Sequence, residues 1–226
     1  MNKFTKTILT LSVVPFLITA CNNESTKAKV IENAIEPVAK LKEEPIKIET
    51  HGPKANSKPI NTAKEASSIV NEVFKDVAKI GPQGKYMILV FGTNTCPYCM
   101  KLKEDIYKSK EFQKRLKNDY SSYYLRTHEN LRHKLYHEKE YMDVDTKTMI
   151  SIYGVEGTPT IIFTDKQGKA IIMVPGYMPS NQFLVTMDFI EQRKWEGKDR
   201  KNGEVYQALK DYYIEKGVIK NGKITK

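Results

Sequence analysis

The spacing of apolar residues predicts a helix followed by a buried strand where the folded part of the chain begins. Residues 62–65 read Thr-Ala-Lys-Glu, the form of a helix capping box, and apolar residues then recur at helical spacing up to Ile80. Gly81-Pro82 follows and stops the pattern. Residues 86–91 are an unbroken apolar run, which is typical of a strand covered on both faces. We therefore expect a helix over 62–80 and a central strand over 86–91.

The rest of the pattern predicts alternating helices and strands. Cys96 begins a helix whose apolar face continues through Ile106, and Ser109 opens another that carries Phe112 and Leu116. The later predicted elements are a strand over 121–126, a helix from Asp145 to Tyr153, a hairpin of strands 161–164 and 170–174, and a helix over 181–195. This order predicts an α/β domain.

One more amphipathic helix is predicted near the end of the chain. Its apolar positions are Val205, Leu209, Tyr212 and Tyr213, and it ends at Gly217. We expect this helix to pack on the domain as an extension rather than to bind a membrane or another protein.

The first twenty residues predict an export signal. Lys3 and Lys6 precede an apolar run over 8–18 that is too short to span a bilayer comfortably. The segment ends in Ile-Thr-Ala-Cys, which resembles a bacterial lipobox, so Cys21 would be the first mature residue and would carry lipid. The alternative is an ordinary secretory signal with a coincidental cysteine; it is less favoured because no other cleavage site fits nearby.

Residues 21–60 are rich in Lys, Glu, Pro, Asn and Ala and show no sustained apolar period, so we expect a flexible tether. Its root-mean-square reach would be roughly 35 Å. The predicted organisation is a signal peptide over 1–20, the tether over 21–60, a folded domain over 61–197 and a basic C-terminal extension over 198–226.

The formal net charge of +10 comes from 37 basic and 27 acidic residues dispersed along the chain. Dispersed lysines favour solubility over a specific electrostatic partner, although a basic surface could also favour anionic lipid or acidic proteins. Nucleic acid is not expected as a partner of an exported protein.

The most informative motif is Cys96-Pro97-Tyr98-Cys99. Proline at the first position of a helix loses no hydrogen bond, and the helix N-terminus offers free N–H groups and partial positive charge to a Cys96 thiolate. This placement lowers the pKa of Cys96 and makes it the candidate nucleophile. Cys99 lies one turn later and is the candidate resolving cysteine, which makes the Cys96–Cys99 pair a redox-active disulfide with no need of another cofactor.

Metal and structural alternatives are weaker for this pair. A structural zinc site needs four ligands, and Cys21 is the only other cysteine in the chain. A disulfide that closes so short a loop removes little chain entropy. Binding of Cu(I) by Cys96 and Cys99, as in a metallochaperone, remains the alternative from a different functional class.

Three segments together resemble the thioredoxin superfamily over about residues 86–195: the strand 86–91, the Cys-Pro-Tyr-Cys motif, and residues 153–160, which read Tyr-Gly-Val-Glu-Gly-Thr-Pro-Thr. The resemblance implies a central mixed sheet flanked by helices, here with an N-terminal helix and a C-terminal helical extension. It also implies that Pro159 is cis beside the active-site cysteines, and that Thr158 docks a substrate strand through its backbone.

The chain departs from thioredoxin itself at two positions. Thr95 stands where thioredoxin usually has Trp, and Val90 stands where it has the buried Asp that is thought to handle the proton of the resolving cysteine. This leaves the proton route of Cys99 unassigned. The departures favour exported relatives, which include lipid- or membrane-tethered reductases of cytochrome c maturation and sulfur oxidation. Tyr98 is a second clue, because Cys-Pro-Tyr-Cys also occurs in glutaredoxins and periplasmic disulfide isomerases.

The sequence therefore predicts a lipid-anchored periplasmic thiol–disulfide oxidoreductase, with a reductase favoured over an oxidase or isomerase. Its partners would be periplasmic proteins with disulfides or thiols, and a membrane thiol-electron donor. The segment 128–145 looks like an insertion; we expect His133 and His137 to share a helix face there. A metal pair is less favoured than a solvated or partner-contacting insertion, because basic residues surround both.

Overall fold

The computed structural model describes residues 62–137, 139–220 and 223–224. The predicted signal peptide, Cys21 and the tether over 21–60 lie outside the described residues. Within the described part, no helix is both long enough and apolar enough to cross a membrane.

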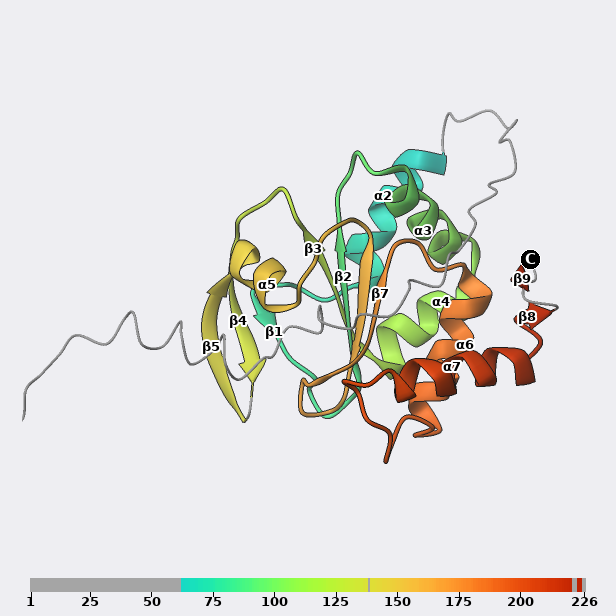
Figure 1. Cartoon of the computed structure of the whole chain (residues 1–226). Coiled ribbons are helices and arrows are strands. Elements are labelled where there is room, and N and C mark those ends of the chain that lie inside the picture. Colours follow the sequence, from blue (N-terminus) through green and yellow to red (C-terminus); the bar gives the residue numbers. More distant parts are fainter. Residues whose placement is uncertain (1–61, 138, 221–222, 225–226) are drawn as a thin grey trace, which may run out of the picture. The chain divides into compact units, whose positions relative to one another are not determined.

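A four-stranded mixed sheet forms the centre of the domain (Figure 1). Its strands are β2 (Met87–Gly92), β3 (Ser121–Arg126), β6 (Thr160–Thr164) and β7 (Ala170–Pro175), in the order β3-β2-β6-β7. β2 pairs parallel with β3 and antiparallel with β6, and β6 and β7 form the predicted antiparallel hairpin. Every residue of β2 and β6 is buried, as expected for central strands covered on both faces. The predicted mixed sheet is confirmed.

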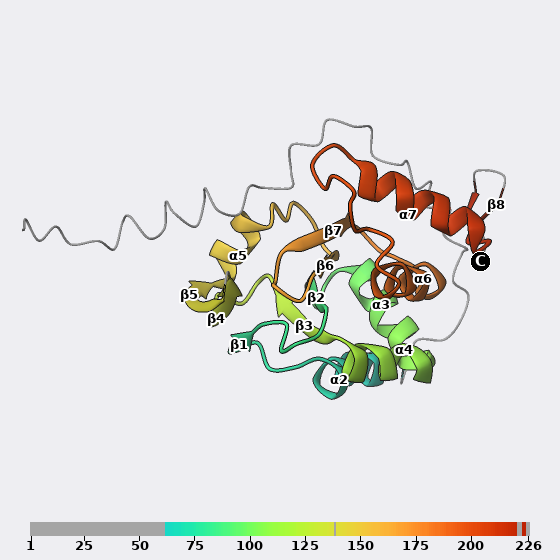
Figure 2. The same cartoon turned by 90° about the horizontal axis from the view of Figure 1, so that it is seen from below.

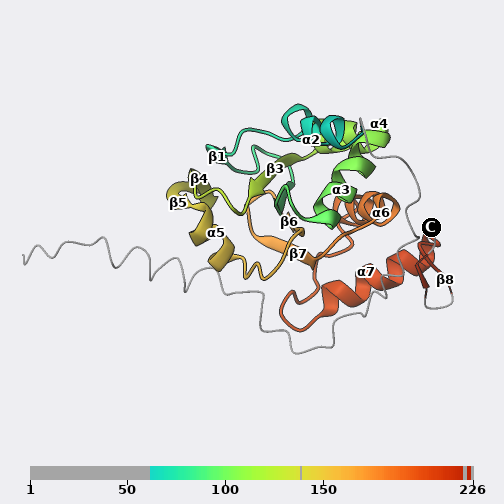
Figure 3. The same ribbon diagram turned by 90° about the horizontal axis from the view of Figure 1, so that it is seen from above.

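Helices cover both faces of this sheet. α3 (Pro97–Lys108) and α6 (Ser180–Glu191) lie on one side, whereas α5 (Thr146–Ile152) lies on the other (Figures 2 and 3). α2 (Thr62–Val73) packs beside α3, and α4 (Lys110–Lys114) continues into a π-helical turn, η2 (Arg115–Asp119). The predicted α/β thioredoxin-like architecture is therefore confirmed.

The two faces of β2 feed different parts of the core because side chains alternate along a strand. Ile88 and Val90 point toward α3 and α6 and join the large cluster that includes Leu102 and Phe183. Phe91 points the other way, and its ring lies 6.0 Å from that of Tyr153 at the end of α5. The strand that precedes Cys96 is thereby held from both sides.

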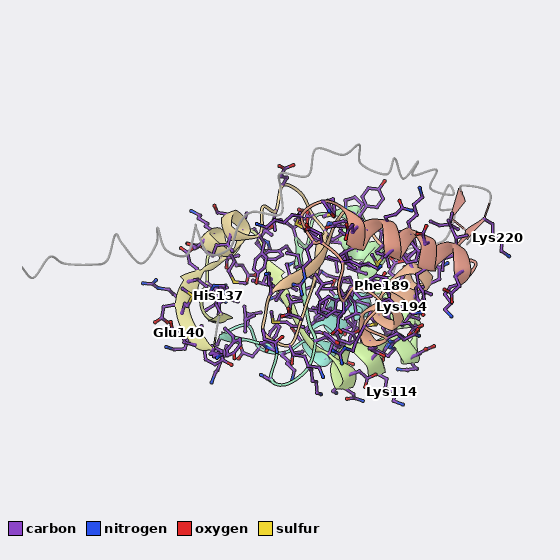
Figure 4. All side chains as sticks on the ribbon, turned by 60° about the horizontal axis from the view of Figure 1, so that its bottom comes forward. Lys114, His137, Glu140, Phe189, Lys194 and Lys220 are labelled. Atoms are coloured by element: carbon purple, nitrogen blue, oxygen red, sulfur yellow. The ribbon has the colours of Figure 1, made fainter. Side chains whose placement is uncertain are left out.

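The C-terminal helix α7 (Glu204–Glu215) packs on the domain, as predicted. The ring of Phe189 in α6, labelled in Figure 4, belongs to this contact. Its centroid lies 5.7 Å from that of the Tyr212 ring in α7. The Tyr206 hydroxyl accepts a hydrogen bond from the backbone N–H of Met173 in β7 at 3.1 Å. After α7, the short strands β8 (Ile219–Lys220) and β9 (Lys223–Ile224) pair antiparallel.

The first helix is shorter than predicted. It ends at Val73, and the Asp76 carboxylate then accepts a hydrogen bond from the N–H of Ala78 at 2.7 Å, which closes a local turn. Ile80 belongs instead to β1 (Lys79–Ile80), which pairs parallel with the strand that follows residue 131. Ile80 is apolar because it is buried in β1, and its position matches the helical repeat only by coincidence.

The segment 128–145 is a β-hairpin, so the predicted helix face of His133 and His137 was wrong. Its strands β4 (Arg132–His137) and β5 (Glu140–Asp145) pair antiparallel, with His137 opposite Glu140, and β1 completes a three-stranded sheet (Figure 4). Burial alternates along β4, with His133 and Leu135 inside. In the described residues, no group of three or more His, Cys, Asp or Glu side chains could hold a metal ion.

Candidate active site

Cys96 lies at the junction between β2 and α3, where it caps the helix. Its backbone is extended, with φ −81° and ψ 119°, and Pro97 occupies the first turn of α3. The N–H of Cys99 donates to Cys96 Sγ at 3.2 Å, and Thr93 Oγ1 accepts from the N–H of Cys96 at 3.1 Å. Sequence reasoning placed Cys96 correctly at a helix N-terminus, where backbone N–H groups stabilise a thiolate.

A loop more than sixty residues away in the sequence contacts the same sulfur. The thiol of Cys96 donates to the carbonyl oxygen of Thr158 at 3.1 Å, and the Thr158–Pro159 peptide bond is cis. The Pro159 carbonyl accepts from the N–H of Gly176 at 2.7 Å, which ties the loop to the end of β7. The structure thus brings together Thr158, Pro159 and the two cysteines.

The two cysteines differ in exposure and in acidity. Both are free thiols; Cys96 is half-buried and Cys99 is fully buried. Burial raises the pKa of Cys96, but hydrogen bonds from Cys99, Thr158 and the backbone outweigh it, so the pKa lies below the usual value. Burial, followed by the hydrogen bond with Cys96, raises the pKa of Cys99. This contrast suits Cys96 for nucleophilic attack and Cys99 for a later step.

Tyr98 presents an aromatic surface beside Cys96. Its side chain is 47% exposed and stacks on Tyr177, with ring centroids 6.3 Å apart and planes 25° apart. The Tyr177 hydroxyl donates to the carboxylate of Asp105, and Lys101 Nζ lies 5.4 Å from the centroid of the Tyr177 ring. Sequence reasoning did not place Tyr177 beside Tyr98, because the contact joins α3 to the segment after β7.

Two further polar side chains lie behind Cys99, and sequence reasoning missed both. Lys103 follows Cys99 by four residues on α3, is 1% exposed, and donates to Asn94 Oδ1 at 3.2 Å. Tyr124 lies on β3, where burial raises the pKa of its hydroxyl and its interaction with Cys99 raises it further. The spacing of Lys103 from Cys99 was a readable signal, whereas the position of Tyr124 depends on strand pairing.

A family model described as a thioredoxin-like domain matches residues 73–191, which contain both cysteines and the Thr158–Pro159 loop. The chain belongs to the thioredoxin-like domain family. Family membership is consistent with thiol–disulfide oxidoreductase activity. The match ends at the last residue of α6, so α7 lies outside it.

A solved structure with 36% sequence identity agrees with this assignment. A thioredoxin-fold protein from Helicobacter pylori is 36% identical, with a TM-score of 0.62, and the match covers 68% of this chain and 98% of that one. A thioredoxin-like protein from Clostridium perfringens is 18% identical with a TM-score of 0.35, over 64% of this chain and 98% of that one. The search of curated proteins found no match.

Proposed function

We propose that this protein reduces disulfide bonds in exported proteins through Cys96 and Cys99. The observation that supports the proposal most directly is the contrast within the pair. Cys96 is accessible and has a lowered pKa, whereas Cys99 is fully buried and has a raised pKa. A thiolate that forms readily at the surface is the species that attacks a disulfide.

The reaction begins with attack by the Cys96 thiolate on one sulfur of a substrate disulfide. A Cys96–substrate disulfide forms, the substrate disulfide breaks, and the released substrate thiolate takes a proton from water. A hydrogen bond from the Cys99 N–H stabilises the Cys96 thiolate for this attack.

Cys99 then resolves the mixed disulfide. Its thiol loses a proton, and its sulfur attacks Cys96 Sγ, which forms the Cys96–Cys99 disulfide and releases the second substrate thiolate. The substrate has gained two electrons, one proton from water and one proton from Cys99, and the protein has lost two electrons and the Cys99 proton. A further turnover needs a partner dithiol that supplies two electrons, and we propose that a membrane thiol-electron donor does so.

We propose that substrates dock as an extended strand beside Thr158 and Pro159, with Tyr98 as an apolar contact. The Thr158 carbonyl already lies 3.1 Å from Cys96 Sγ, so a strand bonded to this loop would bring its disulfide to the nucleophile. Pro97 and Tyr98 are both exposed.

The proposed location is the periplasmic face of a bacterial membrane. The proposal rests on the signal-like residues 1–20, on lipidation of Cys21, and on the tether over 21–60, which would leave the domain over 61–197 and the extension over 198–226 free to meet partners. With this location, the protein would resemble the exported reductases of cytochrome c maturation and sulfur oxidation. Incorporation of a labelled fatty acid tests it: Cys21→Ser should abolish the label, and a label that persists in this variant would contradict lipidation at Cys21.

The reduction potential tests the direction of electron flow. The full chain carrying Cys21→Ser, which keeps only the active-site pair, is equilibrated in glutathione buffers of stepped ratio and its thiols are trapped. A potential near about −270 mV supports a reductase, whereas one near about −120 mV contradicts it and favours an oxidase. A pair that forms no disulfide under any ratio would exclude thiol–disulfide exchange altogether.

A further inference from the structure

The resolving step requires Cys99 to lose a proton in a buried, largely apolar place. The strand position that holds an acid in thioredoxin is occupied by Val90, which is fully buried and can accept no proton. Burial is the main cause of the raised pKa of Cys99. We therefore expect another group near Cys99 to favour loss of its proton near neutral pH.

The neighbouring strand supplies a polar group beside Val90. In the parallel pairing of β2 with β3, Tyr124 is the register partner of Val90. A β-carbon built on Gly92 would lie 2.2 Å from the Tyr124 hydroxyl oxygen and 3.4 Å from Cys99 Sγ. The hydroxyl and the thiol therefore share one side of Gly92, and only a glycine leaves room for this approach.

The Tyr124 hydroxyl is buried without a conventional partner. Its oxygen makes no hydrogen bond of standard geometry to any described residue. An unpaired buried hydroxyl destabilises the fold, so this one calls for a functional explanation. After burial, Cys99 acts on this hydroxyl most strongly, ahead of Cys96 and Arg126, and a Cys99 thiolate would accept its hydrogen.

Lys103 adds a buried positive charge to the same region. Its Nζ lies 5.0 Å from the centroid of the Tyr124 ring and bonds to the neutral amide oxygen of Asn94. Among the described residues, no carboxylate forms an ion pair with it. Burial is the largest cause of the lowered pKa of Lys103, and the charge of Arg126 lowers it further. The charges of Cys99 and, more weakly, Cys96 raise this pKa, as expected of anionic partners.

We propose that Lys103 and Tyr124 stabilise the thiolate of Cys99 when it resolves the mixed disulfide, a role that rests on the proposed thiol–disulfide exchange. The Lys103 ammonium supplies the opposite charge, and the Tyr124 hydroxyl donates a hydrogen bond to the sulfur. The proton that Cys99 loses ends on the departing substrate thiolate, so one S–S bond forms, one breaks, and charge is conserved. Both are positioning residues for Cys99.

Two further titratable groups among the described residues act on this cluster: Cys96 acts on Cys99, and Arg126 acts on Lys103 and Tyr124. Cys96 is the sulfur that Cys99 attacks. Arg126 of β3 lowers the pKa of both Lys103 and Tyr124, but its side chain is 34% exposed and lies 3.8 Å from the carboxylate of Glu129. Exposure and this partner screen its charge, so the buried Lys103 acts more strongly on the thiolate.

The test measures the acidity of Cys99 directly. In the full chain carrying Cys21→Ser and Cys96→Ser, Cys99 is the only thiol. Its rate of alkylation by iodoacetamide is followed against pH, with Lys103→Met or Tyr124→Phe added. We expect each variant to shift the Cys99 profile to higher pH, and Lys103→Met to slow alkylation near neutral pH about tenfold, the effect of one pKa unit. Lys103→Arg, which keeps the charge, should recover much of the rate.

Two matched controls separate this role from a structural one. Lys108→Met removes an exposed charge from the same helix, and Tyr123→Phe removes a buried hydroxyl that donates to the Gly81 carbonyl at 2.9 Å on the other face of β3. Neither should move the Cys99 profile, even where thermal unfolding shows a loss of stability. Unshifted profiles in both Lys103→Met and Tyr124→Phe would overturn the proposal, and if Lys103→Met fails to fold, Tyr124→Phe decides alone.

Failure of this proposal can be distinguished from failure of the proposed function. If the wild-type pair fails to cycle in glutathione buffers, the proposed reductase function fails whatever the Cys99 profile shows. If the pair cycles but neither variant shifts the profile, only the role of Lys103 and Tyr124 is lost.

Discussion

Cys96 Sγ lies 3.1 Å from the carbonyl oxygen of Thr158, so a sulfur fixed by a helix N-terminus is also in contact with the loop that opens β6. The first contact favours a thiolate there. The second would guide an approaching strand to the sulfur in the docking mode that we propose. Each contact comes from a different part of the chain, and the predictions below separate their contributions.

The division of labour within the cysteine pair predicts different outcomes for its two serine variants. Cys96→Ser should abolish reduction of a model disulfide protein, because the attacking sulfur is gone. Cys99→Ser should still attack but should accumulate a mixed disulfide with the substrate, visible as a slower band on a non-reducing gel. Accumulation of the adduct in Cys96→Ser instead would reverse the assigned roles.

The lowered pKa of Cys96 predicts fast alkylation below the usual range for a thiol. Since the thiolate is the reactive form, the alkylation rate in a Cys21→Ser, Cys99→Ser chain should reach half of its maximum below about pH 8.5 and fall as the pH drops further. The rate of that chain is compared with the rate of free cysteine across the same pH range. A midpoint at a higher pH than that of free cysteine would contradict the lowered pKa of Cys96.

The ion pairs of Arg115 predict that the contact between η2 and α6 contributes measurably to stability. Its guanidinium donates to Asp188 at 2.7 Å and to Glu191 at 2.8 Å, with its side chain only 11% exposed. Arg115→Ala should lower the free energy of unfolding by about 1–3 kcal/mol, measured by urea denaturation. The control Arg193→Ala removes an exposed pair with Glu196 and should leave stability nearly unchanged.

His133 predicts a structural role for the segment that forms the small sheet. Its Nδ1 lies 2.7 Å from the Val77 carbonyl oxygen and its Nε2 lies 2.9 Å from Thr146 Oγ1, so one ring joins β4 to α5 and to the turn before β1. His133→Leu should cost about 1–3 kcal/mol of stability through buried polar groups left unpaired. The exposed His128→Ala should cost far less. Equal effects of the two variants would argue against this bridging role.

Much of the fold was readable from the sequence because its signals are local. The apolar run at 86–91 matches β2 within one residue at each end, and the strand over 121–126 matches β3. Asp145 caps α5 as predicted, with its carboxylate accepting from the N–H of Thr148 at 2.8 Å. Strand propensity, caps and turn residues act within a few positions, so one sequence suffices to find them.

The errors arose where a distant partner decided the local structure. Ile80 fits a helical repeat, but pairing with Leu135 places it in β1. His133 and His137 are four apart, which suits a helix, yet the hairpin with β5 makes that segment a strand. Spacing alone cannot show these choices, because the pairing energy comes from a partner strand that lies outside the repeat itself.

The sequence by itself determined the reactive motif and its place at the start of a helix, because Pro97 and the spacing of Cys96 and Cys99 act within one turn. Only the tertiary structure decided what surrounds the pair. The parallel register of β2 with β3 sets Tyr124 beside Val90, and the fold buries Lys103 behind Cys99. Burial and strand register depend on the packing of the whole domain. Burial also strengthens the electrostatic interactions of the Lys103 charge and the Tyr124 hydroxyl, because the local dielectric constant is low.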